Sequence, residues 1–235
     1  YNRLFTKFIC RLYDKIIFYT KTDWLNSIND KIINSQKSSY ANNTLVVDQK
    51  PFLNRSLESH INLIFIGSLR KDKNIKELIE LFKILKEKNN NIQLKIIGDG
   101  PLKNYILKKQ KSISGILYYG EILDEDIIAA HMNKSHIFIN LGHSGLSIVH
   151  SFCYGLPYVA SKSYLNHPPE ISYLHNGKNG ILVDAKKIDK VAGEIENILG
   201  NKNLYNQMSL NAFNSYKKIS YKKWLEKIYE SISKF

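Results

Sequence analysis

Short apolar runs and amphipathic stretches alternate along the chain from about residue 60. Residues 61–67, 92–98 and 115–120 are apolar runs of strand length, and each precedes a stretch with apolar residues at helical spacing. Further strands are expected at 137–139, 157–161 and 180–183, with helices at 75–85, 102–112, 124–133, 146–154, 187–199, 203–217 and 221–233. This alternation predicts an α/β fold, a Rossmann-like, mostly parallel sheet with helices on both faces.

The first 55 residues have a different pattern. Apolar residues between Leu4 and Leu12 have helical spacing, residues 15–20 resemble a short strand, and a helix is expected from Thr22 to Ile33. One strand and two helices cannot bury a core of their own. Residues 1–55 are therefore predicted to be the tail of a preceding domain with a linker, followed by a main domain over 56–218 and a C-terminal helix over 219–235.

Composition excludes several protein classes. A hydrophobic content of 43% and a charged content of 23% are ordinary for a globular protein. No run approaches the length of about 18 apolar residues that a membrane-spanning helix needs, and the first residues lack the apolar core of a signal peptide. Cys10 and Cys153 belong to no C-x-x-C pair, so we expect neither a disulfide framework nor a cysteine zinc site, which fits a reducing cytoplasm.

The formal net charge of +13 favours an anionic partner or surface. The lysines are dispersed over most predicted helices, which is also typical of a solvated face, and no nucleic-acid-binding module is present. We therefore expect no nucleic-acid partner. An acidic membrane surface, which many lysines can attract collectively, is the more plausible partner.

Residues 136–157 combine an apolar strand, a glycine turn and a short helix. The first N–H groups of such a helix point outward at the positive end of its dipole and can bind a phosphate. Gly142 and Gly145 would let a ligand approach the backbone, and Ser144 and Ser147 would add hydroxyl donors. The alternative is a tight connection without a ligand.

Glycine lies at or near the end of four predicted strands. These glycines are Gly67, Gly98, Gly120 and Gly142. Ligands bind parallel sheets at the carboxyl ends of the strands, so this placement favours close approach of a ligand over turn chemistry alone. Arg70 and Lys73 lie where a cation would meet bound phosphates, although either could be a surface charge.

Five motifs resemble, in order and spacing, the nucleotide-sugar-binding domain of the family 4 glycosyltransferases over roughly residues 60–200. They read GSLRKDKNIKELIELFKIL, LKIIGDGPL, YYGEI, GLSIVHSFCYGLP and PPEISYLHNGKNGILV. The resemblance implies the GT-B fold of two facing Rossmann-like domains, of which this chain would hold the C-terminal half and a short remnant of the preceding domain. It also implies that residues 224–232 cross back onto that first domain.

The resemblance assigns roles to single residues. Lys73 would contact the donor diphosphate, the backbone of Gly145, Leu146 and Ser147 would cradle it, and main-chain groups at residues 120–122 would hold the base. Lys73 and Arg70 are the expected catalytic residues. The expected donor-binding residues are Gly67, Ser68, Gly98, Gly120, Ile122, Gly142, His143, Ser144, Gly145, Leu146, Ser147, His150 and Glu170.

Three positions depart from the family pattern. Ser68 stands where arginine is usual, and Gly142 and His150 stand where a pair of glutamates is usual. A branch of bacterial surface-polysaccharide enzymes is similar, with glycine and histidine at the latter two positions. His150 could hold one ribose hydroxyl or simply be satisfied by a neighbour. Glu170 could take part of the role at the sugar or be a first-turn glutamate favoured by a helix dipole.

No metal or cofactor is expected, because the histidines lack ligand spacing and no Asp-x-Asp motif is present. The resemblance implies the donor-binding part of a retaining, metal-independent, hexosyl-type glycosyltransferase. It would use a nucleotide-diphosphate sugar and a glycan or lipid-linked acceptor in polysaccharide biosynthesis, at the cytoplasmic face of the membrane. The chain alone should bind nucleotide with little turnover. The alternatives are a non-catalytic nucleotide-sugar-binding subunit, a phosphorylase or a nucleotide-sugar epimerase.

Overall fold

The computed structural model describes residues 3–47, 53–58, 60–163 and 167–233. The chain divides into two compact units, one of residues 1–46 with 217–235 and the other of residues 47–216. The larger unit contains the long parallel sheet, and the smaller unit contains a second, two-stranded sheet.

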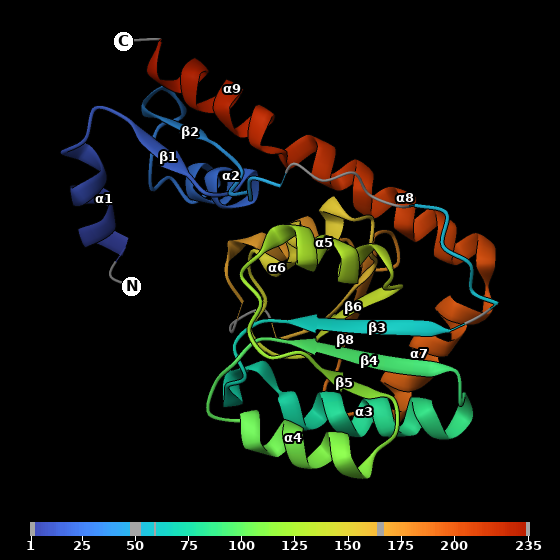
Figure 1. The fold of residues 1–235 in the computed structure, drawn as a ribbon. Coiled ribbons are helices and arrows are strands. Elements are labelled where there is room, and N and C mark those ends of the chain that lie inside the picture. The colour runs from blue at the N-terminus through green and yellow to red at the C-terminus, as the bar shows by residue number, and fades with distance from the viewer. Residues whose placement is uncertain (1–2, 48–52, 59, 164–166, 234–235) are drawn as a thin grey trace. The chain divides into compact units, whose positions relative to one another are not determined.

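The larger unit is built on a six-stranded sheet in which all neighbouring strands are parallel. The strands are β3 (Ile61–Ile66), β4 (Ile92–Ile97), β5 (Ile116–Tyr118), β6 (Ile137–Asn140), β7 (Tyr158–Ser161) and β8 (Gly180–Val183). Their order is β5-β4-β3-β6-β7-β8. From β3 the sheet grows first to one side, through β4 and β5, and then to the other side, through β6, β7 and β8, so the topological switch point lies between β3 and β6 (Figure 1). Ligands of such sheets bind outside the carboxyl ends of the strands at this switch point.

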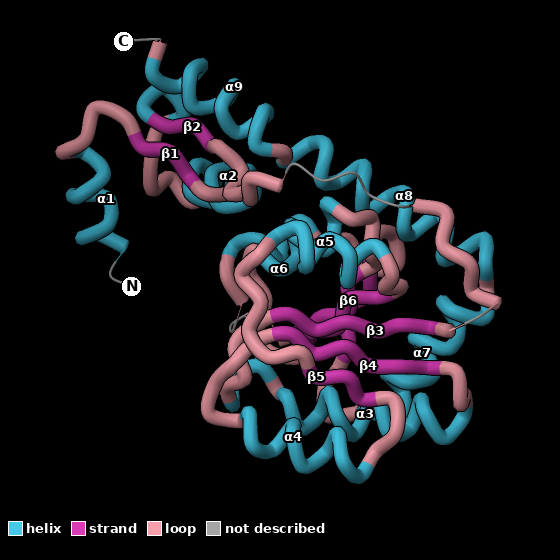
Figure 2. Tube along the Cα trace, viewed as in Figure 1, coloured by secondary structure: helices cyan, strands magenta, loops and turns pink. Residues whose placement is uncertain are grey.

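Helices cover both faces of this sheet, which confirms the predicted fold class. Figures 1 and 2 show α3 and α4 on one face, with α5 and α6 on the other. The helices are α3 (Ile75–Lys88), α4 (Lys103–Ser112), α5 (Glu125–Asn133), α6 (Ser147–Cys153), α7 (Ile188–Gly200) and α8 (Lys202–Ile219), and the 3₁₀-helices are η2 (Lys71–Lys73) and η4 (Pro169–Tyr173). η4 lies between β7 and β8 along the chain.

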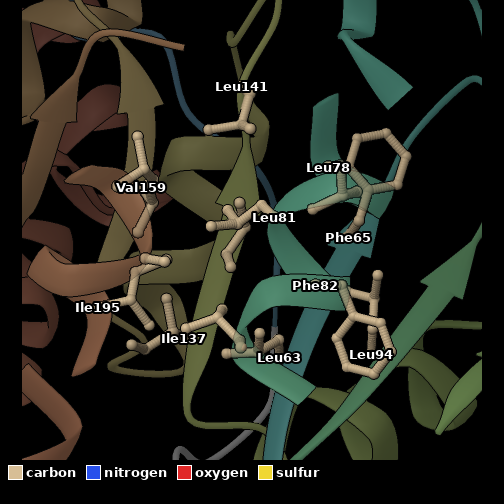
Figure 3. Packing of buried hydrophobic residues seen from close by; sticks show 14 of the residues in the cluster. Leu63, Phe65, Leu78, Leu81, Phe82, Leu94, Ile137, Leu141, Val159 and Ile195 are labelled. Carbon is tan, nitrogen blue, oxygen red and sulfur yellow. The ribbon is translucent and has the colours of Figure 1, made fainter. Parts of the chain in front are cut away.

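The core lies between the sheet and the helices. Leu63 of β3, Leu94 of β4 and Ile137 of β6 pack with Phe82 of α3, and all four side chains are fully buried (Figure 3). Each side chain of this size stabilises the fold by about 1.5–3 kcal/mol. The strands consist mostly of apolar residues because helices cover both faces.

The smaller unit pairs two short parallel strands with helices. Its elements are α1 (Arg3–Arg11), β1 (Ile16–Phe18), α2 (Lys21–Asn29), the 3₁₀-helix η1 (Ser35–Lys37), β2 (Ser38–Tyr40) and α9 (Tyr221–Ile232). The Thr20 side chain caps α2 by accepting a hydrogen bond from the backbone N–H of Asp23 at 3.1 Å. Ser39 of β2 lies within hydrogen-bond distance of Ser231 of α9, with 2.7 Å between their hydroxyl oxygens.

Two features of the smaller unit differ from the sequence prediction. β2 was not expected, since its sequence of two serines and a tyrosine has no apolar run. α2 ends at Asn29, four residues before the predicted end at Ile33. The helix stops there because Lys31 adopts a left-handed conformation with φ of 55°.

β3 and β4 end side by side at Gly67 and Gly98. Gly98 has a φ of +137°, and a Cβ atom there would overlap the carbonyl oxygen of Gly67. The N–H of Gly98 donates to the carbonyl oxygen of Gly120 at 2.7 Å. Glycine at position 98 therefore allows three strand ends to lie close together.

We predict that Gly98→Ala lowers the free energy of unfolding by roughly 2–4 kcal/mol, because the methyl group forces two backbone segments apart. The control is Gly193→Ala, since Gly193 is exposed in α7 with open space around its Cβ position. This control should be neutral or stabilising by up to about 1 kcal/mol. Urea denaturation measures both, and equal effects would contradict the steric explanation.

Lys95 is a charged residue in the middle of β4 with an exposed fraction of only 6%. Burial lowers its pKa to about 8, and the nearby ammonium of Lys134 contributes in the same direction. Between pH 8 and 10.5 the unfolded chain therefore holds a proton on this amine that the folded chain has lost. The contribution of Lys95 to stability must rise with pH across this window.

We predict that Lys95→Met stabilises the chain by about 1–3 kcal/mol at pH 7, where folding must bury the charged amine. The advantage should shrink as the pH rises from 8 to 10.5, because the wild-type amine becomes neutral. Urea denaturation at pH 7 and pH 10 measures the difference. Lys108→Met, at an exposed site of α4, is the control and should show no such pH dependence. A pH-independent difference for Lys95→Met would contradict the prediction.

Candidate functional site

The loops after β3, β4, β5 and β6 lie at one edge of the sheet, because parallel strands end on the same side. This edge brings the sequence-predicted residues together. Gly67, Ser68, Arg70 and Lys73 follow β3, Gly98 follows β4, Gly120 and Ile122 follow β5, and residues 142–147 follow β6. His150 lies one turn further along α6, and Glu170 lies in η4.

The turn from Gly142 to Gly145 is held by its own hydrogen bonds. The Asn140 side chain accepts from the N–H of Gly142 at 3.1 Å and donates to the carbonyl oxygen of His143 at 3.2 Å. The buried hydroxyl of Ser144 donates to the carbonyl oxygen of Gly142 at 3.1 Å. The turn is therefore fixed before any ligand binds, and the Ser144 hydroxyl is used within the turn.

The segment after β3 packs directly against this turn. The N–H of His143 donates to the carbonyl oxygen of Asp72 at 2.9 Å, and the Asn74 side chain donates to the carbonyl oxygen of Leu141 at 2.8 Å. A Cβ atom at Gly142 would overlap the backbone of Asp72 and Lys73. A side chain at position 142 therefore has no room in this arrangement.

Lys73 is half-buried at the turn, and its ammonium donates to the carbonyl oxygen of His143. Burial lowers the pKa of Lys73, and the nearby Asp72 carboxylate opposes this shift. An ammonium has three donors, so two remain for a ligand. Lys73 is thus placed to meet an anion at the turn.

Arg70 is in a different environment. Its guanidinium forms an ion pair with Asp72 at 3.2 Å, and both side chains are about half exposed. Such an exposed pair contributes little to stability and is easily rearranged. Ser68 is half-buried and carries no charge. In the structure, the Arg70 cation is therefore paired within the loop after β3.

His167, which the sequence analysis did not select as a site residue, joins the loop after β7 to the turn. Its Nδ1 accepts from the N–H of Ser144 at 3.0 Å, so its Nε2 carries the hydrogen and donates to the carbonyl oxygen of Ser161 at 3.0 Å. Burial lowers the pKa of His167, which favours this neutral tautomer. The N–H of Ser144 is therefore used within the fold.

Glu170 is 4% exposed and lies beside Gly145. A Cβ atom on Gly145 would be 3.7 Å from Glu170 Oε2 and 3.1 Å from the ring of Pro168. Glu170 lies in the first turn of the five-residue 3₁₀-helix η4, which agrees with the alternative of a first-turn glutamate stated from the sequence. The structure places a buried carboxyl group against the glycine turn.

The hydroxyl of Ser147, at the start of α6, lies 2.8 Å from the hydroxyl of Tyr158. Tyr158 is fully buried and stacks on Phe138, with 5.0 Å between the ring centroids. Burial raises the pKa of Tyr158 to about 12, so this phenol is neutral. Ser147 is therefore anchored to β7 through its side chain, and its backbone N–H lies in the first turn of α6, where N–H groups have no partner within the helix.

His150 is hydrogen-bonded to Glu125, the first residue of α5. His150 Nε2 lies 2.9 Å from Glu125 Oε1, and the hydroxyl of Tyr154 donates to the same oxygen at 2.6 Å. Burial raises the pKa of Glu125, but the hydrogen bonds from His150 and Tyr154 outweigh it and the net pKa is lowered. A carboxylate only accepts, so Nε2 of His150 carries a hydrogen. Glu125 was missed because a glutamate at a helix start is ordinary.

The strand end expected to hold a base is open. Gly120 has a φ of +72°, and a Cβ atom there would meet no atom within 4 Å. Ile122 is half-exposed two residues later. The hydroxyl of Tyr118 donates to the carbonyl oxygen of Gly98 at 3.0 Å, which fixes the neighbouring strand end. The backbone at Gly120 is therefore open on the side of its Cβ position.

A cavity of about 580 Å³ lies beside the glycine turn. Its lining includes Asp72, Asn74, Gly142, His143 and His167. Hydroxyl-rich ligands suit this lining, because it offers carboxylate, amide, imidazole and backbone groups. The cavity volume is in the range of small-molecule sites.

Within the described ranges, no group of three or more histidine, cysteine, aspartate or glutamate side chains is arranged to hold a metal ion. Both cysteines are free, and burial raises the pKa of the Cys153 thiol to about 11. No helix in the part of the chain that the structure describes is long and apolar enough to cross a membrane.

Residues 48–215 match the protein family described as Glycosyl transferases group 1. The match covers most of the chain and all six strands of the large sheet. Among curated proteins, no sequence matches the chain significantly.

Several solved structures share this fold. A mutant of S. aureus TarM in complex with UDP is 18% identical with a TM-score of 0.72, over 94% of this chain and 44% of TarM. Anabaena HepE in complex with UDP is 14% identical with a TM-score of 0.73, over 100% of this chain and 69% of HepE. The C-terminal domain of LpcC from Francisella tularensis, a group 1 family glycosyl transferase, is 19% identical with a TM-score of 0.59. The match covers 68% of this chain and 86% of the LpcC domain.

At these identities the structural matches show the fold alone, and this chain spans less than half the length of TarM. The family match and the six-stranded parallel sheet agree with the resemblance stated from the sequence. The chain belongs to the group 1 glycosyl transferases, and its larger unit has the fold of the C-terminal, nucleotide-sugar-binding domain of a GT-B enzyme.

Proposed function

We propose that this chain is the donor-binding part of a retaining, metal-independent glycosyltransferase of hexosyl type. It transfers a sugar from a nucleotide-diphosphate sugar to a glycan or lipid-linked acceptor in polysaccharide biosynthesis. The observation that carries the proposal is the hydrogen bond from Lys73 to the glycine turn after β6. This contact lies at the switch point of the sheet, in a chain of the group 1 glycosyl transferases.

The diphosphate lies between Lys73 and the start of α6. The backbone N–H groups of Gly145, Leu146 and Ser147 donate to the phosphate oxygens, and the Lys73 ammonium adds a charge-assisted bond. As the bond to the sugar breaks, negative charge develops on the leaving diphosphate. Lys73, with Arg70 released from Asp72, stabilises that charge.

The base lies at the open strand end of Gly120 and Ile122, where main-chain groups contact its edge. The donor sugar occupies the cavity beside Gly142 and His143. Because position 142 has no room for a side chain, the polar groups for the sugar come from neighbouring elements. Glu170 lies next to Gly145 and contributes its carboxyl group.

The acceptor site belongs to the other domain of the GT-B fold. The smaller unit of this chain, residues 1–46 with 217–235, is the part of that domain that accompanies the donor domain here. The chain alone therefore binds a donor nucleotide and turns over little. The net charge of +13 would attract the protein to an acidic membrane surface, where a lipid-linked acceptor would lie.

A non-catalytic nucleotide-sugar-binding subunit is the second candidate. It is favoured by the absence of a carboxylate at position 142 and of an arginine at position 68. Sugar transfer by the full-length protein, measured with a donor that the chain binds, separates the two candidates.

We predict that Lys73→Ala weakens binding of the preferred nucleoside diphosphate by about 1–3 kcal/mol, because a charge-assisted bond to the diphosphate is lost. Calorimetric titration with UDP, GDP, CDP and ADP identifies the preferred base. UDP comes first because TarM and HepE were crystallised with it.

The matched control for this prediction is Lys71→Ala, an exposed lysine of the same 3₁₀-helix η2. It should bind the nucleotide within about twofold of wild type, since surface charges contribute little. Thermal unfolding shows whether each variant is folded. An equal loss in both variants would indicate a general charge effect, and no loss in a folded Lys73→Ala would refute the role of Lys73.

A further inference from the structure

A carboxylate lies beside position 150, although the chain has histidine there. It belongs to Glu125, which precedes His150 by 25 residues and reaches it from α5. Both hydrogen bonds that the structure shows on this carboxylate, from His150 and from Tyr154, go to Oε1. A carboxylate has about four acceptor positions, so Oε2 retains the capacity to accept from a ligand.

Glu125 is also the more accessible member of the pair. Its side chain is 37% exposed, whereas that of His150 is 12% exposed. The net lowering of its pKa keeps it ionised at neutral pH. A ligand hydroxyl that approaches from solvent therefore meets the carboxylate more readily than the imidazole.

The place of Glu125 in the fold is next to the proposed donor. α5 begins directly after the loop that carries Gly120 and Ile122, which would hold the base. His150 lies three residues after Ser147 on α6, a rise of about 4.5 Å, which is close to the width of one sugar ring. Glu125 is thus carried by the helix that follows the proposed base-binding loop, and it contacts the helix that begins at the proposed phosphate-binding turn.

We propose that Glu125 is a further donor-binding residue, whose carboxylate accepts a hydrogen bond from a ribose hydroxyl of the nucleotide. His150 and Tyr154 are positioning residues that hold this carboxylate from α6. The ligand class is a ribonucleotide, because hydroxyls donate and a carboxylate only accepts. This inference rests on the proposed function, since it assigns one subsite of the same donor.

The test compares a ribonucleotide with its analogue that lacks both ribose hydroxyls. The full 235-residue chain is titrated with the tightest binder among UDP, GDP, CDP and ADP, and with its 2′,3′-dideoxy counterpart. Wild type should prefer the ribonucleotide by about tenfold or more, as expected for a hydrogen bond to a charged group. Glu125→Ala should reduce this preference to about twofold or less.

Two further variants separate contact from folding. Glu125→Gln preserves the shape of the side chain but replaces one acceptor oxygen with a donor, and it should also lose most of the preference. The control is Asp126→Asn, which changes the neighbouring exposed carboxylate of α5 and should keep the preference for the ribonucleotide. His150→Gln can still donate to Glu125 and should keep most of the preference, whereas His150→Leu should lose it.

A folded Glu125→Ala or Glu125→Gln that keeps the wild-type preference overturns the inference. Equal weakening for both nucleotides, with the preference unchanged, also overturns it, because that result indicates a structural role only. If Lys73→Ala weakens binding while the Glu125 variants keep the preference, the proposed function stands and this inference fails. If the folded wild type binds none of the four nucleotides, both are refuted.

Discussion

The site depends on one close backbone contact at the switch point of the sheet. The carbonyl oxygen of Asp72 accepts the N–H of His143, and the backbone of Asp72 and Lys73 occupies the space that a side chain on Gly142 would need. Only glycine fits at position 142 while the two loops pack this closely. The same contact holds Lys73 beside the turn, so the position of the cation and the absence of a side chain at 142 have one steric cause.

The acidic groups near this contact come from other elements of the fold. The family resemblance leads one to expect carboxylates at positions 142 and 150, and the chain has neither. Yet Glu170 lies beside Gly145 and Glu125 lies beside His150, each carried by a different element. A carboxyl group at or near a packed surface is costly unless hydrogen bonds compensate it. The Glu125 carboxylate receives such compensation from His150 and Tyr154, which indicates that its placement is maintained by the surrounding fold.

The sequence predicted the larger unit well because its strands and helices are coded by local apolar periodicity. The strand expected at 61–67 is β3 at Ile61–Ile66, and the loops that it and its neighbours carry gather at the expected edge. The partner of His150 could not be predicted, since Glu125 is 25 residues away and their contact depends on the packing of α5 against α6. The role of His167 depends in the same way on a tertiary contact with Ser144.

The glycines show a second limit of prediction from the sequence, which is that the sequence does not identify the group that approaches a glycine. From the sequence, a glycine at a strand end favours close approach of a ligand, and Gly120 with its open surroundings agrees with that interpretation. At Gly98 and Gly142 the group that approaches is another part of the backbone. Pattern alone cannot distinguish these cases, because both require the absence of a Cβ atom and differ only in what lies opposite.

Lys73 is the cation that contacts the glycine turn, in a chain that carries a net charge of +13. Arg70 is paired with Asp72, position 68 is serine, and Lys73 is half-buried. Burial lowers the pKa of Lys73, but it also removes water that would screen the charge. A diphosphate at the turn would favour the charged amine and interact with it more strongly than with an exposed lysine. In the proposed function, Lys73 and the backbone donors take the role for which the family usually has two cations, and the dispersed lysines act at long range on the approach of an anionic donor.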